Sequence, residues 1–453
     1  MTSYQQAAER LLALGHELHL TPTHKFELRY IRVLLEALGN PQRRFPSVLI
    51  AGTNGKGSTA ATLAAILTAA GHKTALYTSP HLVRVNERLR INGDTIPDEE
   101  FARAWEAVEE AATKLLGSGA LPWHPSFFET LTAMAFLYFA QEAVEVAVLE
   151  VGMGGRLDAT NVVEPALTVI TDIALDHQKF LGDTIAEIAA EKAGILRAGV
   201  PVVTLPQHPE ANDVVGKAIQ ERGARAVSAV KYVPPVSPGA ELVTGPQPAG
   251  RNRYPLEVMG EEIVVDSPLP GRHQLRNLAL AIAAAEELNA QGIAITAKQV
   301  EQGVRETRWP GRFQVTAAHD AWPEMVLDVA HNPAGAWALR AALSERIGER
   351  RLVFLFGAMR DKAIQEMAEI LFPLAERVIA TRPDNPRAAA PEEIREAAAR
   401  TGAEVELEPD VAKALERARE RARNGGIVVV TGSIYLVGAV LGMLGESGRP
   451  RNL

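Results

Sequence analysis

The sequence predicts an α/β fold in two domains: a phosphate-loop domain built on a parallel sheet, followed by a smaller α/β domain. An apolar, strand-like run at 48–50 leads through a glycine-rich loop at 52–58 into an alanine-rich helical pattern at 59–70. A second apolar strand, at 144–149, ends in a carboxylate, Glu150. Strand and helix patterns alternate again beyond residue 310, and 453 residues are too many for one ordinary core.

Composition narrows the class of protein. With 47% hydrophobic and 23% charged residues, the chain has the make-up of a soluble globular protein. Its start is polar and no apolar run approaches the roughly 18 residues of a membrane span, so we expect a cytoplasmic protein without a membrane partner. The absence of cysteine excludes thiol catalysis, disulfides and cysteine-bound zinc. A net charge of -8 argues against a general nucleic-acid binder, although a local basic site for an acidic substrate stays possible.

The loop at 52–58 reads GTNGKGS and has the features of a phosphate-binding loop. Its glycines let backbone N–H groups turn towards an anion at a helix N-terminus. Lys56 adds a positive charge, and the Ser58 hydroxyl can reach Mg²⁺. The spacing differs from the common G-x-x-x-x-G-K-[ST] pattern, so this is a variant loop. A plain glycine turn between strand and helix would not need the lysine or the hydroxyls.

The elements on either side of this loop follow from hydrophobic periodicity. Residues 4–39 read as two helices broken at Thr21-Pro22, and 73–77 read as a strand followed by a polar corner that contains Ser79. Amphipathic and apolar helices are expected at 98–116 and 127–141, respectively. Three arginines lie between the strand at 73–77 and the helix at 98–116, and they allow two interpretations, a solvated charged face or a site that attracts carboxylates: Arg84, Arg88 and Arg90.

Three polar groups follow the carboxyl ends of predicted strands, where ligands bind in open α/β sheets. They are Ser79, Glu150 and His177, the last of which follows the strand at 167–171. A strand that ends in a carboxylate resembles a Walker-B element, which places an acidic group beside the Mg²⁺ of a nucleotide. Together the three groups suggest a Mg²⁺ shell, although imidazole is an unusual ligand for that ion and His177 alone could be an ordinary loop histidine.

Lys192 lies on a predicted helix at 184–197, beside Glu191. The simplest interpretation is a surface lysine. If it faces the metal site instead, neighbouring cations would lower its pKa, and the neutral amine could take up CO₂ as a carbamate. A carbamate would turn the cation into an oxygen ligand for metal.

The remainder of the chain continues the α/β alternation. A strand is expected from residue 201, and helices are expected at 209–222, 277–290 and 296–307. Hairpin-like strands are expected around 226–232 and 254–265, with a linker at 233–253. Proline and glycine at 310–311 mark a boundary between domains 1–308 and 309–453. The second domain should hold a mostly parallel sheet with strands at 325–329, 351–356, 377–380, 404–407 and 427–431.

Seven segments, in order along nearly the whole chain, resemble the folylpolyglutamate synthase and dihydrofolate synthase branch of the Mur ligases. They are GTNGKGS (52–58), SPHL (79–82), LEVGMGGRLDATN (149–161), ALDH (174–177), EKAGI (191–195), GRFQ (311–314) and DVAHNP (328–333). The resemblance implies a P-loop NTPase-like Mur ligase central domain followed by a smaller, Rossmann-like α/β C-terminal domain. Members are commonly monomers.

The resemblance also implies the chemistry. ATP phosphorylates a carboxylate of a reduced folate or of dihydropteroate, and the amine of L-glutamate displaces the phosphate to form an amide. Mg²⁺, as two ions, would neutralise the charge that develops, because a carboxylate is a poor electrophile until one oxygen becomes a leaving group.

Site residues are carried over position by position. Ser79, Glu150 and His177 match the family's Mg²⁺ ligands, and Lys192 matches a lysine that is carbamylated in relatives. Lys56, Lys192, His177 and Glu150 are the catalytic set. The ATP-binding positions are Thr53, Asn54, Gly55, Lys56, Gly57, Ser58, Asn277, Arg312, Asp328 and His331. The pterin-binding positions are Lys25, Phe26, Ser126, Phe127, Phe128, Glu129, Leu157, Asp158 and Ala159.

One departure concerns the pterin segment, which reads Ser-Phe-Phe-Glu at 126–129, where a Thr-Tyr-Phe-Glu type of run is expected. The run at 156–161 is closer to members that also use dihydropteroate, so both activities are expected; a monofunctional folylpolyglutamate synthase is the alternative. A peptidoglycan Mur ligase would need an additional N-terminal domain, for which the residues before Gly52 leave no room. A phosphate-loop ATPase without ligase chemistry would not explain His177, Lys192 or the second domain.

Overall fold

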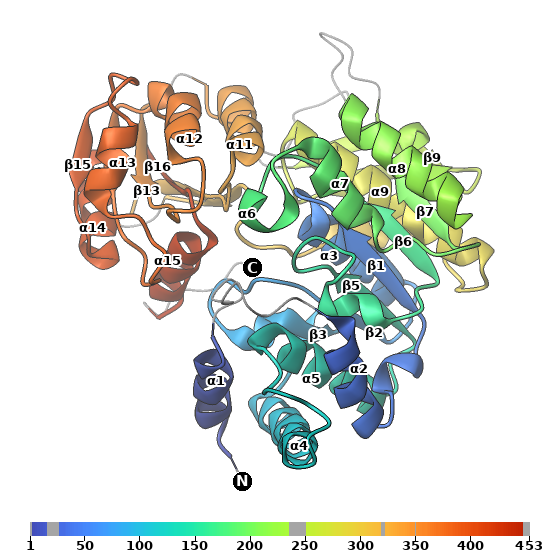
Figure 1. Ribbon diagram of the computed structural model, residues 1–453. Helices are drawn as coiled ribbons and strands as arrows, with labels where there is room; N and C mark the ends of the chain where they lie inside the picture. The colour runs from blue at the N-terminus through green and yellow to red at the C-terminus, as the bar shows by residue number, and fades with distance from the viewer. Residues whose placement is uncertain (1, 16–26, 235–250, 319–321, 349, 447–453) are drawn as a thin grey trace.

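The computed structural model describes residues 2–15, 27–234, 251–318, 322–348 and 350–446 (Figure 1). We refer to the parts before and after the boundary proposed at 308/309 as the N-terminal and C-terminal domains. Helices α1 (Tyr4–Ala13) and α2 (Leu28–Ala37) lie within the predicted helical segment. The predicted break at Thr21-Pro22 lies outside the described residues, as do Lys25 and Phe26.

The N-terminal domain is built on an eight-stranded sheet with the order β4-β3-β2-β5-β1-β6-β7-β8. Strands β2, β5, β1, β6, β7 and β8 pair in parallel, whereas β3 and β4 are antiparallel additions at one edge. The strands span Ser47–Ala51 (β1), Thr74–Tyr77 (β2), Leu89–Ile91 (β3), Asp94–Thr95 (β4), Val146–Glu150 (β5), Leu167–Ile170 (β6), Pro201–Thr204 (β7) and Arg225–Ser228 (β8). The predicted parallel sheet is confirmed.

Helices cover both faces of this sheet, because successive side chains of a strand point to opposite faces. In β1, Leu49 and Ala51 belong to the core on one face, which also includes residues of α1, α2, α4 (Asp98–Gly117), α5 (Phe127–Gln141), α7 (Ile185–Ala193) and α8 (Pro209–Arg222). Val48 and Ile50 belong to the core on the other face, with residues of α3 (Lys56–Ala69), α9 (Arg272–Ala290) and α10 (Ala297–Glu306). All of β1 is therefore buried, and the loop that follows it is fixed from both sides.

Two sequence-based boundaries and one pairing need correction. Helix α3 begins at Lys56 and α9 at Arg272, several residues before the predicted starts, because Gly55 and Gly271 adopt backbone angles outside the helical region. The hairpin-like pairing expected around 226–232 is wrong, since β8 is a parallel edge strand beside β7. The hairpin is formed by β9 (Asn252–Val258) and β10 (Glu261–Ser267) alone.

The C-terminal domain holds a six-stranded sheet with the order β11-β12-β16-β13-β14-β15, in which only β11 is antiparallel. Its strands are Gln314–Thr316 (β11), Glu324–Leu327 (β12), Leu352–Phe356 (β13), Arg377–Ala380 (β14), Val405–Leu407 (β15) and Ile427–Thr431 (β16). Helices α11 (Pro333–Arg346), α12 (Ile364–Leu371) and α13 (Pro391–Ala397) cover one face, and α14 (Val411–Arg421) and α15 (Ile434–Glu446) the other. The predicted mostly parallel sheet is confirmed, although β11 was not foreseen.

The three arginines after β2 serve the fold. Arg84 forms an exposed ion pair with Asp98 at 2.8 Å. Arg88 is buried, with its Nε 2.9 Å from His81 Nδ1 and its guanidinium over the ring of Phe127. Arg90 stacks over Trp309. Only Arg84 therefore matches the solvated interpretation, and Arg88 and Arg90 do not form a free carboxylate-binding group.

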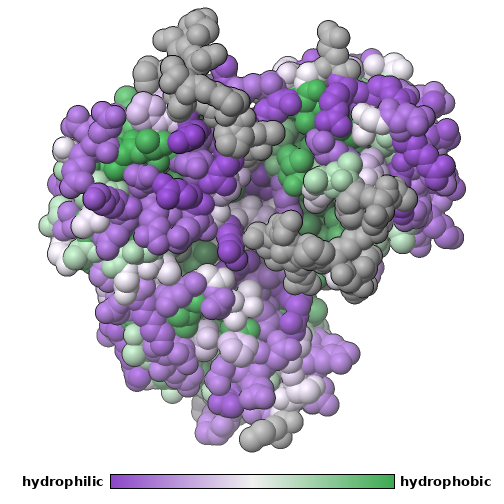
Figure 2. Space-filling model, turned by 180° about the vertical axis from the view of Figure 1, so that it is seen from behind, coloured by the Kyte–Doolittle hydropathy of each residue, from purple (hydrophilic) through white to green (hydrophobic). Residues whose placement is uncertain are grey.

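Two observations concern the surface and the lengths of the helices. On the face shown in Figure 2, hydrophobic residues form small, separate areas within a mostly hydrophilic surface. None of the helices among the described residues is long and apolar enough to cross a bilayer.

The domains meet where the loop after β2 contacts α15. Leu82 packs against the core on the α14/α15 side of the C-terminal sheet. A Cβ atom on Gly438 of α15 would lie only 1.9 Å from the carbonyl oxygen of Leu82. Only glycine allows this approach, whereas a Cβ on Gly442, one turn further on, would meet its nearest neighbour at an ordinary 3.7 Å.

We therefore expect Gly438→Ala to push α15 away from Leu82 and to lower the melting temperature or the activity. Gly442→Ala is the matched control, because glycine in a helix costs about 1 kcal/mol relative to alanine and removing it should leave stability equal or higher. Thermal unfolding of the two variants checks this. Equal melting temperatures and equal activities would contradict the close contact as a domain anchor.

Candidate active site

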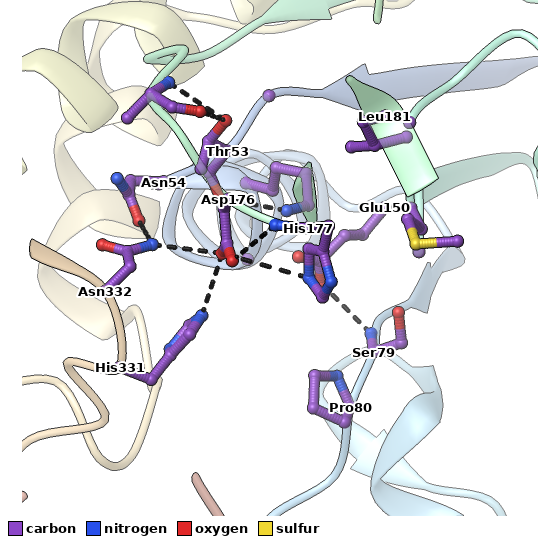
Figure 3. A pocket seen from close by; sticks show the side chains of 18 of the residues that line it. Thr53, Asn54, Ser79, Pro80, Glu150, Asp176, His177, Leu181, His331 and Asn332 are labelled. Carbon is purple, nitrogen blue, oxygen red and sulfur yellow. Dashed lines mark hydrogen bonds and ion pairs between the residues drawn. The ribbon is translucent and has the colours of Figure 1, made fainter. Parts of the chain in front are cut away.

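A cavity of about 940 Å³ opens between the two domains, at the carboxyl ends of the strands in the N-terminal sheet. Its lining comes from both domains (Figure 3). The loops after β1, β2, β5 and β6 reach it from one side, and the loops after β12, β13 and β14, with the first turns of α11 and α15, from the other. This is the position in which open α/β sheets bind ligands.

The glycine-rich loop forms one wall of the cavity. The backbone N–H groups of Thr53 and Asn54 both donate to the carbonyl of Asp172, at 2.8 and 3.1 Å, which ties the loop to the end of β6. Lys56 starts α3 and its Nζ donates to the carbonyl of Thr53 at 3.2 Å. The loop therefore presents a helix N-terminus and a cation to the cavity, the combination that binds phosphates.

Two glycines of the loop are required by close neighbours. Gly52 has φ 154° and a Cβ there would lie 1.8 Å from Thr171 Oγ1. Gly55 has φ 88°, and its Cβ would lie 2.1 Å from Oδ1 of Asn277 on α9. Asn277 thus lies against the loop, as expected if both contact the same nucleotide.

The three predicted Mg²⁺ ligands lie together. Glu150 is buried at the end of β5, and its Oε2 accepts from the backbone N–H of Ser79 at 3.2 Å. Burial raises the pKa of Glu150, and the charge of Lys56 opposes that rise. Figure 3 shows Ser79, Glu150 and His177 on one side of the cavity.

One ring nitrogen of His177 is without a hydrogen-bond partner among the described residues. This atom, Nδ1, is buried. Burial, together with the ammonium of Lys362, lowers the pKa of His177 to about 3, so the ring is neutral and keeps a lone pair. Glu150, a buried carboxylate, and His177 line the same cavity, and this pair of donor types fits a divalent cation. Among the described residues, no three His, Asp or Glu side chains cluster closely enough to hold a metal alone, so Ser79, phosphate oxygens and water would complete the shell.

Lys192 is buried under the phosphate loop. Its Nζ donates to the carbonyl of Gly52 at 2.8 Å, and it has no ion-pair partner among the described residues. Burial and the nearby charge of Lys56 lower the pKa of Lys192 to about 7. The alternative of a surface lysine is wrong, and an appreciable fraction of neutral amine at neutral pH is what carbamylation requires.

The predicted pterin segments divide into lining and supporting residues. Phe128, Leu157 and Ala159 line the cavity, whereas Phe127 is buried in the core beneath Arg88 and is not part of the wall. Ser126 and Glu129 also line it, but their side chains form the capping box of α5, with Ser126 Oγ 2.8 Å from Glu129 Oε2.

Asp158 fixes the loop after β5. Its carboxylate accepts from the backbone of Met153 at 2.9 Å, and from the backbone and hydroxyl of Thr160 at 3.0 and 2.5 Å. Burial raises the pKa of Asp158, and these hydrogen bonds oppose the rise. The side chain is largely occupied in holding the loop, which makes it a supporting residue of the cavity.

The C-terminal domain contributes the remaining predicted residues. Arg312 is in the cavity wall near Glu150, and burial lowers its pKa. Asp328 accepts from the backbone N–H groups of Phe313 and Ala330, at 2.8 and 2.9 Å, and so shapes the loop that carries His331. His331 points towards Asp176 across the cavity (Figure 3).

Sequence reasoning missed Asp176, Asn332 and Lys362. Asn332 Nδ2 donates to Asn54 Oδ1 at 3.0 Å and to Asp176 Oδ2 at 3.2 Å, and Lys362 Nζ lies 2.5 Å from Asp176 Oδ1. Asp176 and Asn332 flank two histidines that had been singled out, which was a usable signal. Lys362 follows β13 in a stretch without a distinctive local pattern.

Two stretches of the chain match known domain families. Residues 50–285 match the Mur ligase middle domain, and residues 311–434 match the Mur ligase glutamate ligase domain. The Bacillus subtilis dihydrofolate synthase/folylpolyglutamate synthase is 36% identical over 410 residues, which cover 90% of this chain and 92% of that protein.

Two solved structures share the fold. Folylpolyglutamate synthase of Mycobacterium tuberculosis, complexed with ADP and AMPPCP, has a TM-score of 0.85 at 31% identity and covers 98% of this chain and 99% of its own. Escherichia coli FolC in complex with DHPP and ADP has a TM-score of 0.80 at 29% identity and covers 99% of both chains.

The position of Glu150 leads to one prediction. Glu150→Gln keeps the shape but removes the charge, so we expect turnover of ATP to fall on the order of a hundredfold or more, with a higher Mg²⁺ requirement. Glu145→Gln, exposed just before the same strand, is the control. Turnover is measured across a Mg²⁺ titration, and normal turnover of Glu150→Gln at low Mg²⁺ would remove this residue from the shell.

The lowered pKa of Lys192 leads to a second prediction, which concerns carbamylation of its amine. Because a pKa of about 7 leaves the amine neutral as pH rises through that value, carbamylation should increase from pH 6 to pH 8 at constant dissolved CO₂. Enzyme stripped of CO₂ should be reactivated by bicarbonate, and more so at pH 8.

Two lysine variants control this experiment. Lys192→Ala should be inactive with or without bicarbonate, whereas Lys217→Ala, an exposed change on α8, should respond like the parent enzyme. A stripped enzyme with full activity at both pH values would contradict a carbamate at Lys192.

Proposed function

Because the chain belongs to the folylpolyglutamate synthase and dihydrofolate synthase family of Mur ligases, we propose that the residues of its cavity join L-glutamate to a folate in the way described below. We also propose that the cavity accepts dihydropteroate. The family's reaction is an ATP-dependent ligation. One observation carries the residue assignments: a phosphate loop, an acidic and an imidazole ligand, and cations from the second domain all face one cavity.

The nucleotide phosphates are proposed to lie on the N-terminus of α3. Lys56 and the first N–H groups of that helix would hold the β- and γ-phosphates. Asn277 lies against the loop, and Arg312 reaches the same space from the other domain. ADP and AMPPCP bound to the Mycobacterium tuberculosis relative support a nucleotide in this position.

Two steps make the amide. An oxygen of the substrate carboxylate attacks the γ-phosphorus, the bond to the β-γ bridging oxygen breaks, and ADP leaves. The neutral amine of glutamate then attacks the acyl carbon and loses one proton to the solvent, and phosphate departs with the original carboxylate oxygen. Arg312 and Lys56 both line the cavity, and we propose that they stabilise negative charge on the transferred group.

Glu150, His177, Ser79 and a carbamylated Lys192 are the groups that would hold Mg²⁺. The ion would supply charge neutralisation for the phosphate oxygens. Lys192 in this form would contribute oxygen atoms from beneath the loop, where its Nζ now contacts Gly52. Glu150 would keep its negative charge once the ion balances the cost of burial.

The folate end is proposed to bind on the apolar half of the cavity. Phe128, Met153, Leu157, Phe180 and Leu181 line this half, and Phe128 packs on Gly152, where a Cβ would lie 2.6 Å from its ring. An aromatic ring and flat aliphatic neighbours suit a planar heterocycle. The Escherichia coli relative was solved in complex with both DHPP and ADP, which supports room for a second ligand beside the nucleotide. We further expect this protein to be a monomer, because members of the family are commonly monomers.

A product assay tests the proposal. The enzyme is incubated with ATP, Mg²⁺, labelled L-glutamate and either tetrahydrofolate or dihydropteroate, and the amide products are separated. We expect labelled product from both acceptors. Product from tetrahydrofolate alone would restrict the enzyme to polyglutamylation, and ATP hydrolysis that ignores both acceptors would contradict ligase chemistry.

A further inference from the structure

The carboxylate of Asp176 connects the two domains. It belongs to the loop after β6 in the N-terminal domain, yet three of its neighbours belong to the C-terminal domain. Lys362 Nζ lies 2.5 Å from Oδ1, whereas Asn332 Nδ2 and His331 Nε2 lie 3.2 and 3.5 Å from Oδ2. Figure 3 shows His331 and Asn332 pointing at Asp176 from across the cavity.

The same carboxylate also shapes the loop that carries a proposed metal ligand. Oδ1 accepts from the backbone N–H of His177 at 2.8 Å. His177 has φ 52°, a left-handed conformation that is uncommon for residues other than glycine. One side chain therefore contacts the second domain and fixes an unusual backbone at the metal site.

A second contact extends the connection to the phosphate loop. Asn332 donates to Asn54 Oδ1 at 3.0 Å as well as to Asp176. The C-terminal domain thus contacts both the nucleotide loop and the loop of His177 through a single atom, Asn332 Nδ2.

From this arrangement we propose that Asp176 and Lys362 form an interdomain latch that positions the loop of His177 when the domains close. Both are positioning residues, which act through the loop and the domain contact. The kinetic part of this inference rests on the proposed function; the structural part does not.

Burial makes the latch sensitive to single changes. The side chains of Asp176 and Lys362 are only 7% and 8% exposed. Removing one member of a buried ion pair leaves the other charge uncompensated, so single variants should be impaired more than the loss of a surface pair would explain. Removing both leaves no lone charge.

A double-mutant cycle separates a latch from a direct role of Lys362 on the substrates. We expect Asp176→Asn and Lys362→Met each to lower kcat/KM for ATP at least about tenfold. The kcat/KM of the double variant should then lie within about threefold of that of the less active single variant. If the loss of kcat/KM in the double variant equals the product of the two single losses, the two residues act independently, and this result would overturn the latch. Arg360→Met is the control, because Arg360 pairs with Glu393 inside the C-terminal domain, in the same connection between β13 and α12.

A distance measurement tests the latch without relying on activity. The chain has no cysteine, so spin labels can be placed at Thr113→Cys on α4 and Ala412→Cys on α14, both exposed positions in different domains. With AMPPCP and Mg²⁺ present, we expect a narrow distance distribution in the parent and in Arg360→Met. Asp176→Asn and Lys362→Met should each broaden it or shift it to longer distances.

An unchanged distribution in both latch variants would overturn the proposal even if their activity falls. Circular dichroism checks that each variant folds, and Lys362→Met tests the latch from the second domain if Asp176→Asn does not fold. Failure of the parent to make a glutamate amide would instead contradict the proposed function and leave the distance test valid.

Discussion

The parallel pairing of β2, β5, β1 and β6 brings the loops after these four strands to one edge of the sheet. Ser79, the glycine-rich loop and His177 lie in those loops and Glu150 is the last residue of β5, so the site depends on the direction of the strands. Reversing any one strand would move its polar group to the opposite edge. The buried register of β1 between β5 and β6, with packed layers on both faces, holds this edge in place.

Burial of charge at that edge gives the site its chemistry. Lys192, Glu150 and His177 are all shifted towards their neutral forms by desolvation. In Asp176, burial acts in the same direction, but the hydrogen bond from His331 and the positive charge of Lys362 outweigh it and keep the pKa well below its usual range. The cavity thus holds three groups that burial shifts towards their neutral forms and one carboxylate that is paired across the domains.

How far the sequence predicted this site depends on whether the signal was local. The loop around Lys56 and the strand end at Glu150 are local patterns of glycine, charge and apolar run, and both lie in the cavity as expected. Phe127 was assigned to the pterin site beside Phe128, but adjacent helical residues point in different directions and Phe127 enters the core. The pairing of Asp176 with Lys362 spans 186 residues and depends on how two domains pack, which no local pattern records.

The central claim is that this cavity passes the γ-phosphate of ATP to a carboxylate and not to water. The most direct measurement is isotope transfer in a single ligation, with both oxygens of the reacting substrate carboxylate labelled with ¹⁸O and the reaction run in ordinary water. If an acyl phosphate forms, each inorganic phosphate released should carry one ¹⁸O from the substrate. Phosphate without that label, recovered alongside amide product, would contradict the account.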